Sequence, residues 1–299
     1  MTATARIAPA GRPRVPEWIR VHLPTTPIFH ETASLIEDLR LHTVCESAKC
    51  PNRWECWGRG TATFMIAGDR CTRACGFCAV TTAKPFALEA DEPQRVADAV
   101  RRMQLEHVVV TAVARDDLPD GGALHFAETI RALRETCPGI VIEVLTPDFN
   151  GQRASLQTVL DAGPDVFNHN LETVRRLTPS VRSRATYDRS LEVLAMAKQI
   201  DPGACTKSGI MLGLGETEAE VQEALRDLRR VGCDIVTIGQ YLQPTLRHLP
   251  VREFVPPERF AHWAEIARRL GFTHVASGPL VRSSYHADDF RPVRRGLAS

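Results

Sequence analysis

Short apolar runs and longer amphipathic segments alternate along the chain from residue 60 onward. The short runs are rich in β-branched residues and predict strands, whereas apolar residues spaced three or four apart predict helices. Strands are expected at residues 63–67, 107–113, 140–145, 165–168, 208–212, 235–238 and 273–276. Helices are expected at residues 95–105, 123–136, 155–162, 187–200, 216–231 and 257–270.

This order of elements predicts an α/β fold with a parallel sheet, because each expected strand is followed by a helix that returns the chain to the same edge. We expect a partial (β/α)6 barrel, an open relative of the TIM barrel, with a doubly wound sheet as the alternative. Residues 61–280 would form this barrel. Residues 1–60 lack the alternation and would form an N-terminal extension, and residues 281–299 a C-terminal one.

Chemically unusual residues follow the expected strands. In a parallel barrel such positions meet at the carboxyl-terminal face, where barrels of this kind place their active sites. In chain order they are Cys71, Cys75 and Cys78, then Arg115, Asp116 and Asp117, then Thr146 and Asp148, then Asn168, Asn170 and Glu172, then Gly213, Gly215 and Glu216, then Gln240 and Tyr241, and finally Arg282 to Tyr285.

The overall charge gives no reason to expect a nucleic acid or a membrane as a partner. Lysine and arginine number 37 against 36 aspartate and glutamate residues, so the net charge is +1. The longest apolar-leaning run, residues 108–114, is too short to span a bilayer. The arginine-bearing N-terminus is reminiscent of a transit peptide, but its prolines oppose the amphipathic helix that such a peptide needs. We therefore expect an irregular N-terminal arm on a cytoplasmic protein.

The cysteine content points to metal ligation. Nine cysteines cannot form a complete set of disulfides, and six of the nine fall within residues 45–78. Clustering of this kind in an intracellular enzyme is typical of metal sites. The remaining three, Cys137, Cys205 and Cys233, are expected to be small residues of the core.

Cys71, Cys75 and Cys78 form a C-x3-C-x2-C motif on the loop after the first expected strand. Three thiolates so close together can hold three irons of a cubane cluster and leave the fourth iron free for a ligand. Zinc is the alternative, but a structural zinc site needs four ligands, and no histidine stands at the required spacing. We expect the neighbouring Arg70 and Arg73 to favour the thiolate form.

A second triplet, Cys45, Cys50 and Cys56, forms a C-x4-C-x5-C motif upstream of the first expected strand. It belongs to the N-terminal extension and is too far from the first triplet in the chain to join the same cubane easily. We interpret it as the site of a second cluster, which also lacks one ligand.

The two cysteine motifs together resemble those of the lipoyl synthase family within the radical S-adenosylmethionine superfamily. The C-x3-C-x2-C loop is similar to that of the superfamily, and the upstream triplet is similar to that of the family. Ala114 stands where many members would have an acid. Further similar segments are TAVARDDLPDGG (111–122), NHNLETV (168–174), KSGIMLGLGET (207–217), TIGQYLQPT (237–245) and VRSSYHA (281–287).

The resemblance implies two 4Fe–4S clusters and S-adenosylmethionine as cofactors. The first triplet would hold the cluster that binds and cleaves S-adenosylmethionine. The second would hold an auxiliary cluster that supplies sulfur to carbons six and eight of an octanoyl chain on a carrier lysine. The implied partners are octanoylated lipoyl carrier domains, both in acyltransferase subunits of 2-oxoacid dehydrogenases and in the glycine cleavage H protein. A flavodoxin or ferredoxin would donate the electron.

The resemblance also implies roles for residues outside the cysteine motifs. One serine of the segment Arg282–Tyr285 would be the fourth ligand of the auxiliary cluster; we favour Ser284 and leave Ser283 open. Oxygen is a weaker ligand than thiolate for these irons, which suits a cluster that is dismantled. Asp116 and Asp117 could form a metal or acid–base pair, but our own interpretation is that they fix the loop near the cofactor. The implied cofactor-binding residues are Asn170, Glu172, Arg184, Gly213, Gly215, Glu216 and Gln240.

Two other classes of protein remain as alternatives. A biotin-synthase-like sulfur inserter or a peptide-maturation enzyme would also use an auxiliary cluster, but such relatives place their auxiliary cysteines differently. A ferredoxin-like electron carrier would ligate its clusters fully and would not need a barrel with a polar face. Cleavage of S-adenosylmethionine under reducing conditions separates the carrier from the enzymes.

Overall fold

The computed structural model describes residues 14–20, 26–285 and 287 of the chain. The predicted N-terminal arm and the end of the predicted C-terminal extension fall largely outside these residues. None of the helices in this part of the chain has the length and the apolar character needed to cross a membrane.

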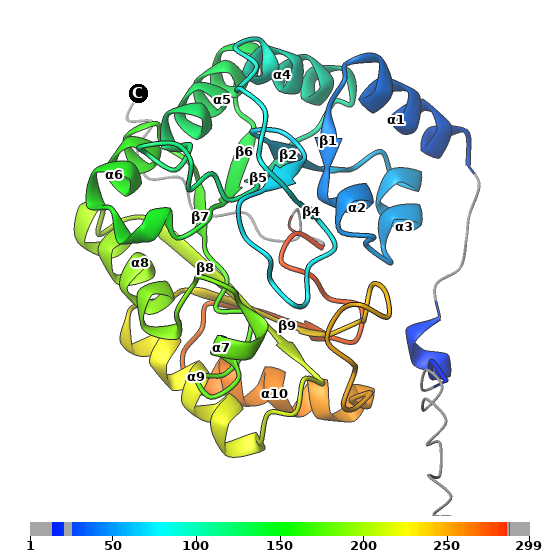
Figure 1. The fold of residues 1–299 in the computed structure, drawn as a ribbon, viewed down its shortest axis with the longest axis vertical. Coiled ribbons are helices and arrows are strands. Elements are labelled where there is room, and N and C mark those ends of the chain that lie inside the picture. Colours follow the sequence, from blue (N-terminus) through cyan, green and yellow to red (C-terminus); the bar gives the residue numbers. More distant parts are fainter. Residues whose placement is uncertain (1–13, 21–25, 286, 288–299) are drawn as a thin grey trace, which may run out of the picture.

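An eight-stranded sheet forms the centre of the molecule (Figure 1). From β2 to β10 its strands are parallel and follow one another in chain order, and β1 pairs with β2 in the antiparallel sense. A doubly wound sheet would reverse its strand order at a switch point, so this order confirms the partial barrel. The strands are β1 (His42–Thr43), β2 (Thr63–Ile66), β5 (His107–Ala112), β6 (Val141–Leu145), β7 (Val166–Asn168), β8 (Cys205–Leu212), β9 (Ile235–Gln240) and β10 (His274–Gly278).

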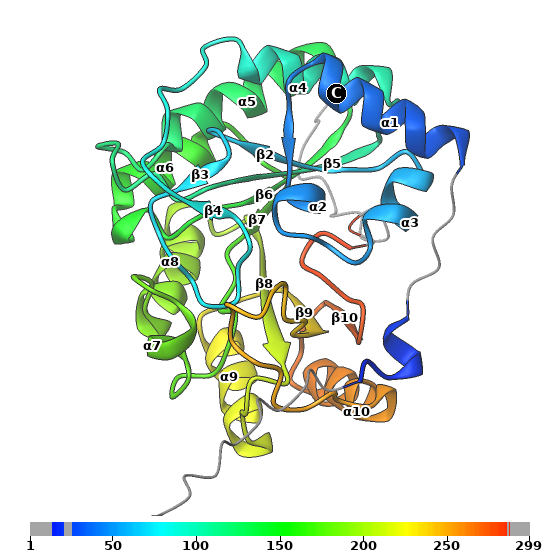
Figure 2. The same ribbon diagram turned by 45° about the vertical axis from the view of Figure 1, so that its right-hand side comes forward.

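Helices cover the outside of this curved sheet, as Figures 1 and 2 show. All six lie within a few residues of their predicted ranges. Helix α9 has a capping box in which the Thr217 side chain and that of Glu220 each bond the backbone of the other, which fixes its first turn. The six are α4 (Glu92–Arg102), α5 (Ala123–Thr136), α6 (Arg153–Asp161), α8 (Tyr187–Ile200), α9 (Glu218–Arg230) and α10 (Pro257–Arg269).

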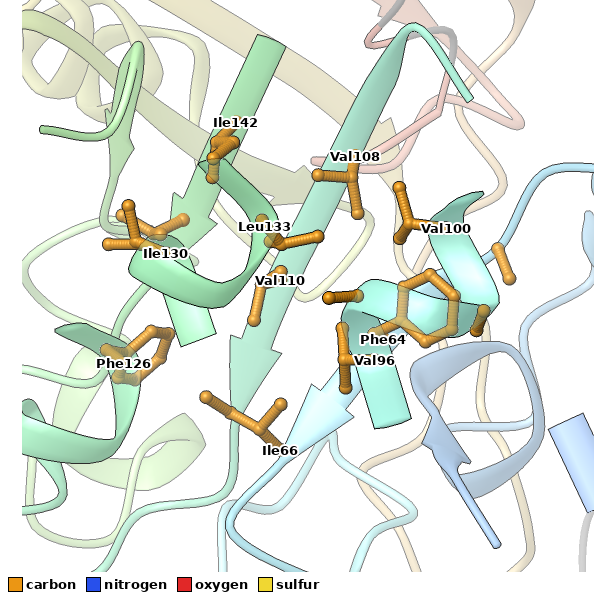
Figure 3. Packing of buried hydrophobic residues seen from close by; sticks show 14 of the residues in the cluster. Phe64, Ile66, Val96, Val100, Val108, Val110, Phe126, Ile130, Leu133 and Ile142 are labelled. Carbon is orange, nitrogen blue, oxygen red and sulfur yellow. The ribbon is translucent and has the colours of Figure 1, made fainter. Parts of the chain in front are cut away.

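Alternating residues of the strands serve the two faces of the sheet. Val108 and Val110 of β5 belong to the apolar core, whereas Thr111 lines a cavity on the other face. Figure 3 shows the packing between β2, β5, β6 and the helices α4 and α5. Its labelled residues are Phe64, Ile66, Val96, Val100, Val108, Val110, Phe126, Ile130, Leu133 and Ile142.

The N-terminal extension contains helices that the sequence pattern did not predict: α1 (Pro27–Asp38), α2 (Val44–Ser47) and α3 (Arg53–Gly58). Phe29 of α1 stacks on Trp54 of α3, with ring centroids 4.7 Å apart, and also contacts Trp57. These contacts hold α3 beside the β1–β2 edge of the sheet (Figure 2). Helices of four and six residues are too short to show a hydrophobic period, which is why the pattern missed α2 and α3.

Smaller elements complete the described chain. The strands β3 (Arg70–Cys71) and β4 (Thr81–Thr82) form a separate two-stranded sheet around the loop of the first cysteine motif. The others are η1 (Glu17–Ile19), η2 (Phe149–Gly151) and α7 (Thr178–Val181).

Candidate active site

One cavity of about 540 Å³ brings both cysteine motifs together. It lies at the carboxyl ends of the parallel strands and is also lined by the N-terminal extension. Most of the polar positions predicted to converge there do so, including Thr146, Asp148 and Tyr241. The motif residues that line it are Cys45, Cys50, Cys56, Cys71, Cys75 and Cys78.

The loop of the first motif, residues 71–78, is held from two sides. The Gly76 N–H donates to the Val181 carbonyl at 2.9 Å, on the side of α7. On the other side, the Nε2 atom of His248 lies 2.9 Å from the carbonyl oxygen of Cys78. These contacts fix the backbone that carries the three thiols.

A buried arginine inside this motif anchors the loop to two strands. The guanidinium of Arg73 donates to both oxygens of Asp116, at 2.9 and 2.7 Å, and to Asp148 at 2.7 Å. Burial opposes the ionisation of Asp148, but the hydrogen bond and charge of Arg73 outweigh it and lower the pKa of Asp148 to about 2. The motif is thereby tied to the ends of β5 and β6.

The charge of Arg73 is therefore largely neutralised, which corrects the expectation that it favours thiolates. Burial, followed by the charges of the neighbouring cysteines, raises the pKa of Cys78 to about 12. Burial also raises the pKa of Cys71, and Arg73 opposes this only weakly. Arg70 lies over the ring of Phe86, 3.9 Å from its centroid. The raised pKa values of Cys71 and Cys78 favour their neutral thiols, so deprotonation of these two must accompany metal binding.

The second motif is spread over α2, the turn that follows and α3. Cys45 lies on α2, Cys56 on α3, and the Cys50 N–H donates to the Cys45 carbonyl at 3.1 Å. Burial and then the charge of Cys50 raise the pKa of Cys45 to about 11. Burial and then the charges of Cys45 and Cys50 raise the pKa of Cys56 to about 12. Because these cysteines affect one another's pKa, the three thiols form one group.

The donor set fits iron–sulfur clusters. Each group offers three thiols, the ligand type that such clusters use, on one wall of a shared cavity. Within the described residues, no three histidine, cysteine, aspartate or glutamate side chains converge as they would around a single metal ion. A cubane spreads its ligands more widely, because each thiolate binds a different iron.

Residues 280–285, which we call the strap, cross from β10 to the N-terminal extension. Asn52 Nδ2 donates to the Leu280 carbonyl at 2.7 Å. At the other end the Tyr285 hydroxyl donates to the Glu55 carboxylate at 3.0 Å. Both contacts reach the segment that carries the second cysteine motif. The strap is therefore fixed beside Cys45, Cys50 and Cys56, as expected for a segment that completes their ligand set.

The two serines of the strap face different neighbours. Asn170 Nδ2 donates to Ser283 Oγ at 2.7 Å. The hydroxyl of Ser284 instead accepts a hydrogen bond from Thr63 Oγ1 at 2.8 Å. Ser284 also lines a small pocket of about 50 Å³ together with Cys56. Ser284 thus lies on the side of the second motif.

Among the predicted cofactor-binding residues, Asn170 and Glu172 line the cavity. Asn170 Nδ2 also donates to Glu172 Oε1 at 3.1 Å, and burial raises the pKa of Glu172. The buried Arg182 lies in the same wall and interacts with the charges of Glu172 and Cys75. Arg184, which the sequence suggested instead, is 63% exposed and lies 3.6 Å from Asp116.

The other predicted cofactor residues are engaged with the backbone. Glu216 accepts hydrogen bonds from the N–H groups of Gly213 and Leu214, at 2.5 and 2.9 Å. The Nε2 atom of Gln240 lies within hydrogen-bond distance of three carbonyl oxygens, to which it can donate two hydrogens, and its oxygen accepts from the Val255 N–H. Gly213, with a φ of +97°, has no room for a side chain beside Gln240. Gln240 lines the cavity, whereas Gly213, Gly215 and Glu216 do not. Their contact with a cofactor stays a prediction.

Sequence reasoning missed two residues of the site. His248 follows no expected strand and contacts the first motif through a long loop. Arg182 carries no motif signal at all. Arg282 was expected at this face, because it follows the last expected strand, but sequence reasoning assigned it no role of its own.

The sequence matches known family models and curated relatives over most of its length. The family model described as the Radical SAM superfamily matches residues 65–228, and that of the N-terminal domain of lipoyl synthase matches residues 3–50. The chain is 56% identical over 287 residues to a lipoyl synthase of Rubrobacter xylanophilus, covering 96% of this chain and 89% of the relative. It is 56% identical over 288 residues to a lipoyl synthase of Thermus thermophilus, with the same coverage of 96% and 89%.

Solved structures share the fold at much lower identity. SuiB of Streptococcus suis, bound to the precursor peptide SuiA, gives a TM-score of 0.56 at 10% identity over 83% of this chain and 52% of SuiB. HydG, a maturase of the FeFe-hydrogenase, gives a TM-score of 0.53 at 13% identity over 83% of this chain and 68% of HydG. At such identities the likeness concerns the fold alone.

Proposed function

The chain belongs to the lipoyl synthase family of the radical S-adenosylmethionine superfamily, and from this we propose which of its residues carry out the reaction. It is a lipoyl synthase, which inserts sulfur at carbons six and eight of a protein-bound octanoyl-lysine. Two 4Fe–4S clusters and S-adenosylmethionine serve it as cofactors. When bound, the clusters and S-adenosylmethionine would pass on the electron from a donor, abstract the hydrogens and provide the sulfur atoms.

In our proposal Cys71, Cys75 and Cys78 hold the cluster that binds S-adenosylmethionine. Cys45, Cys50 and Cys56 hold the auxiliary cluster, with Ser284 as its fourth ligand. The choice of Ser284 is supported by its place with Cys56 in a small pocket that Ser283 does not line. The single observation that carries the proposal is that all six thiols line one cavity.

The remaining walls of the cavity suit the substrate and the cofactor. An octanoyl chain needs an apolar slot, which side chains such as Met65, Val113 and Met211 offer. We propose that Asn170 and Glu172 bind the ribose hydroxyls of S-adenosylmethionine. Gly213, Gly215, Glu216 and Gln240 would shape the neighbouring loops, and Arg184 would act at the rim through Asp116.

A lipoyl carrier protein is the macromolecular substrate. We propose the octanoylated domains of 2-oxoacid dehydrogenase acyltransferase subunits and the glycine cleavage H protein as its sources, and a flavodoxin or ferredoxin as the electron donor. We also propose a cytoplasmic location, since all nine cysteines are free thiols and a reducing compartment keeps them so. Residues 1–60, 61–280 and 281–299 are proposed as extension, barrel and C-terminal extension.

The test separates the two triplets by substitution in the full-length, anaerobically reconstituted enzyme. Cys75→Ala should abolish cleavage of S-adenosylmethionine, because the cluster that binds it loses one of its three thiolate ligands. Cys50→Ala should leave cleavage measurable while the lipoyl product disappears, because only the sulfur donor is affected. Products are read by mass spectrometry on an octanoyl-lysine peptide.

Cys137→Ala is the matched control, since Cys137 ends α5 away from the cavity, where its thiol lies 3.8 Å from the Ala97 carbonyl. It should retain both clusters and both activities. A Cys50→Ala enzyme that inserts sulfur at the full yield would overturn the assignment of the auxiliary cluster.

A further inference from the structure

The guanidinium of Arg282 faces the cavity with little support from the protein. Within the described residues it makes a single hydrogen bond, from Nη1 to the carbonyl of the preceding residue, Val281, at 2.6 Å. Among the same residues no carboxylate lies within ion-pair distance of it. Burial raises the pKa of Cys50 of the second motif, and the charge of Arg282 opposes this by favouring the thiolate.

Arg282 differs in this respect from the other cations of the cavity wall. Arg73 is paired with Asp116 and Asp148. Arg182 donates to Ser190 Oγ at 2.6 Å and interacts with the charge of Glu172.

Among the described residues, Arg282 is the cation of this wall that is neither compensated by a carboxylate nor exposed. The cavity lining contains the cations Lys49, Arg73, Arg182 and Arg282 and the carboxylates Asp148 and Glu172. Lys49 is exposed, so solvent screens its charge. A half-buried cation without an anion is unfavourable, so Arg282 indicates that an anionic group belongs beside it in the cavity.

Strand β9 packs against the strap beside Arg282 and fixes its position. A Cβ atom on Gly239 would lie 2.1 Å from the Val281 carbonyl oxygen and 3.3 Å from Arg282 Nη1. Because Gly239 has no side chain, the strap lies directly against β9. The next residues, Ser283 and Ser284, are fixed by Asn170 and Thr63. The backbone that carries the guanidinium is therefore fixed beside the second motif.

We propose that Arg282 is the counter-cation of the auxiliary cluster. The inference rests on the proposed assignment of that cluster to Cys45, Cys50 and Cys56. Three thiolates and one oxygen anion carry more negative charge than the core of an oxidised 4Fe–4S cluster carries positive charge. The reduction potential of such a cluster depends on its net charge and on hydrogen bonds to its sulfurs. A fixed guanidinium therefore favours retention of the cluster and raises its reduction potential.

The test measures the auxiliary cluster alone. Full-length chain in which Cys71, Cys75 and Cys78 are all alanine is reconstituted anaerobically, and its iron content is determined. The midpoint potential is then followed by electron paramagnetic resonance during a redox titration. Arg282→Gln should shift the potential to more negative values, because the reduced cluster loses its counter-charge. Arg282→Lys keeps the charge and should remain close to the parent.

Lys49→Gln is the matched control, because Lys49 is a cation of the same motif but is exposed. Its removal should shift the potential less than Arg282→Gln does, since water screens an exposed charge. Equal potentials for Arg282→Gln and the parent, at equal iron content, would overturn the proposal.

Cluster loss is informative as well. If the Gln variant fails to hold iron while the Lys variant holds it, the charge is required and the proposal stands. If both lose the cluster equally, the shape of arginine matters rather than its charge, and the proposal fails. A parent chain without iron would instead refute the assignment of the auxiliary cluster itself, so the two failures are distinguishable.

Discussion

Replacing Gly239 by alanine should displace the strap and thereby separate the two half-reactions of this enzyme. Gly239 lies on β9, in register with Gly278 of β10, and its φ is not in the left-handed region, so alanine meets no backbone strain there. The added Cβ atom would lie 2.1 Å from the Val281 oxygen and 3.1 Å from the Val281 carbonyl carbon. Both are backbone atoms, which cannot rotate out of the way.

The size of the effect follows from this overlap. Ordinary contact requires the strap to retreat by roughly 1 Å, and a misplacement of that order can lower a reaction rate by about 10²-fold. Overpacking also costs about 1–3 kcal/mol of folding stability. The strap carries Arg282 and Ser284, so sulfur insertion should fall by about 10²-fold. The loop of Cys71–Cys78 is held by other contacts, and S-adenosylmethionine cleavage should persist.

The assay compares both half-reactions in a single anaerobic turnover. 5′-Deoxyadenosine reports cleavage, and the mass of an octanoyl-lysine peptide reports sulfur insertion. Gly278→Ala is the control, because its Cβ atom would lie 3.4 Å from the Val281 side chain, an ordinary contact. Full lipoyl yield from Gly239→Ala, or a parallel loss of cleavage and insertion, would refute the reasoning.

Two further predictions test the site. Asp148→Asn should lower the free energy of unfolding by about 2 kcal/mol at pH 7, because the pKa of Asp148 is lowered from 3.8 to about 2 in the folded chain. The deficit, measured by urea unfolding, should shrink as the pH falls from 4 towards 2, because Asp148 takes up its proton first in the unfolded chain and then, near pH 2, in the folded one; a constant deficit contradicts it. Ser284→Ala should alter the auxiliary cluster's Mössbauer spectrum and lower the lipoyl yield, whereas Ser283→Ala should leave the spectrum unchanged; the reverse result moves the ligand by one residue.

The barrel was predictable because its signal is strong and repeated. Each strand such as β5 is a short apolar run rich in β-branched residues, and each long helix shows an apolar face. The predicted helices at 123–136 and 187–200 have the same bounds as α5 and α8. Strand order distinguished a barrel from a doubly wound sheet, and no local pattern determines strand order.

The ion pairs around the first motif could not be read from the chain. Arg73 and Asp148 are separated by 75 positions, and their contact depends on how β2 and β6 end at the same face. The sequence placed both residues after expected strands, yet it led us to credit Arg73 with activating thiols. Only the geometry reveals that two carboxylates neutralise the arginine.

The choice between Ser283 and Ser284 depends on the same kind of distant contact. Ser283 and Ser284 lie in a turn that the Tyr285 N–H closes on the Arg282 carbonyl at 3.0 Å, and they contact different neighbours. Asn170, on the side of the proposed cofactor site, donates a hydrogen bond to Ser283, and Thr63, at the start of β2, donates one to Ser284. The strap thus touches the proposed S-adenosylmethionine site with one serine and the proposed auxiliary site with the next. If Ser284 is the ligand that we propose, its release from an iron would pull on the Ser283–Asn170 contact, and we therefore expect the state of the auxiliary site to affect the cofactor site.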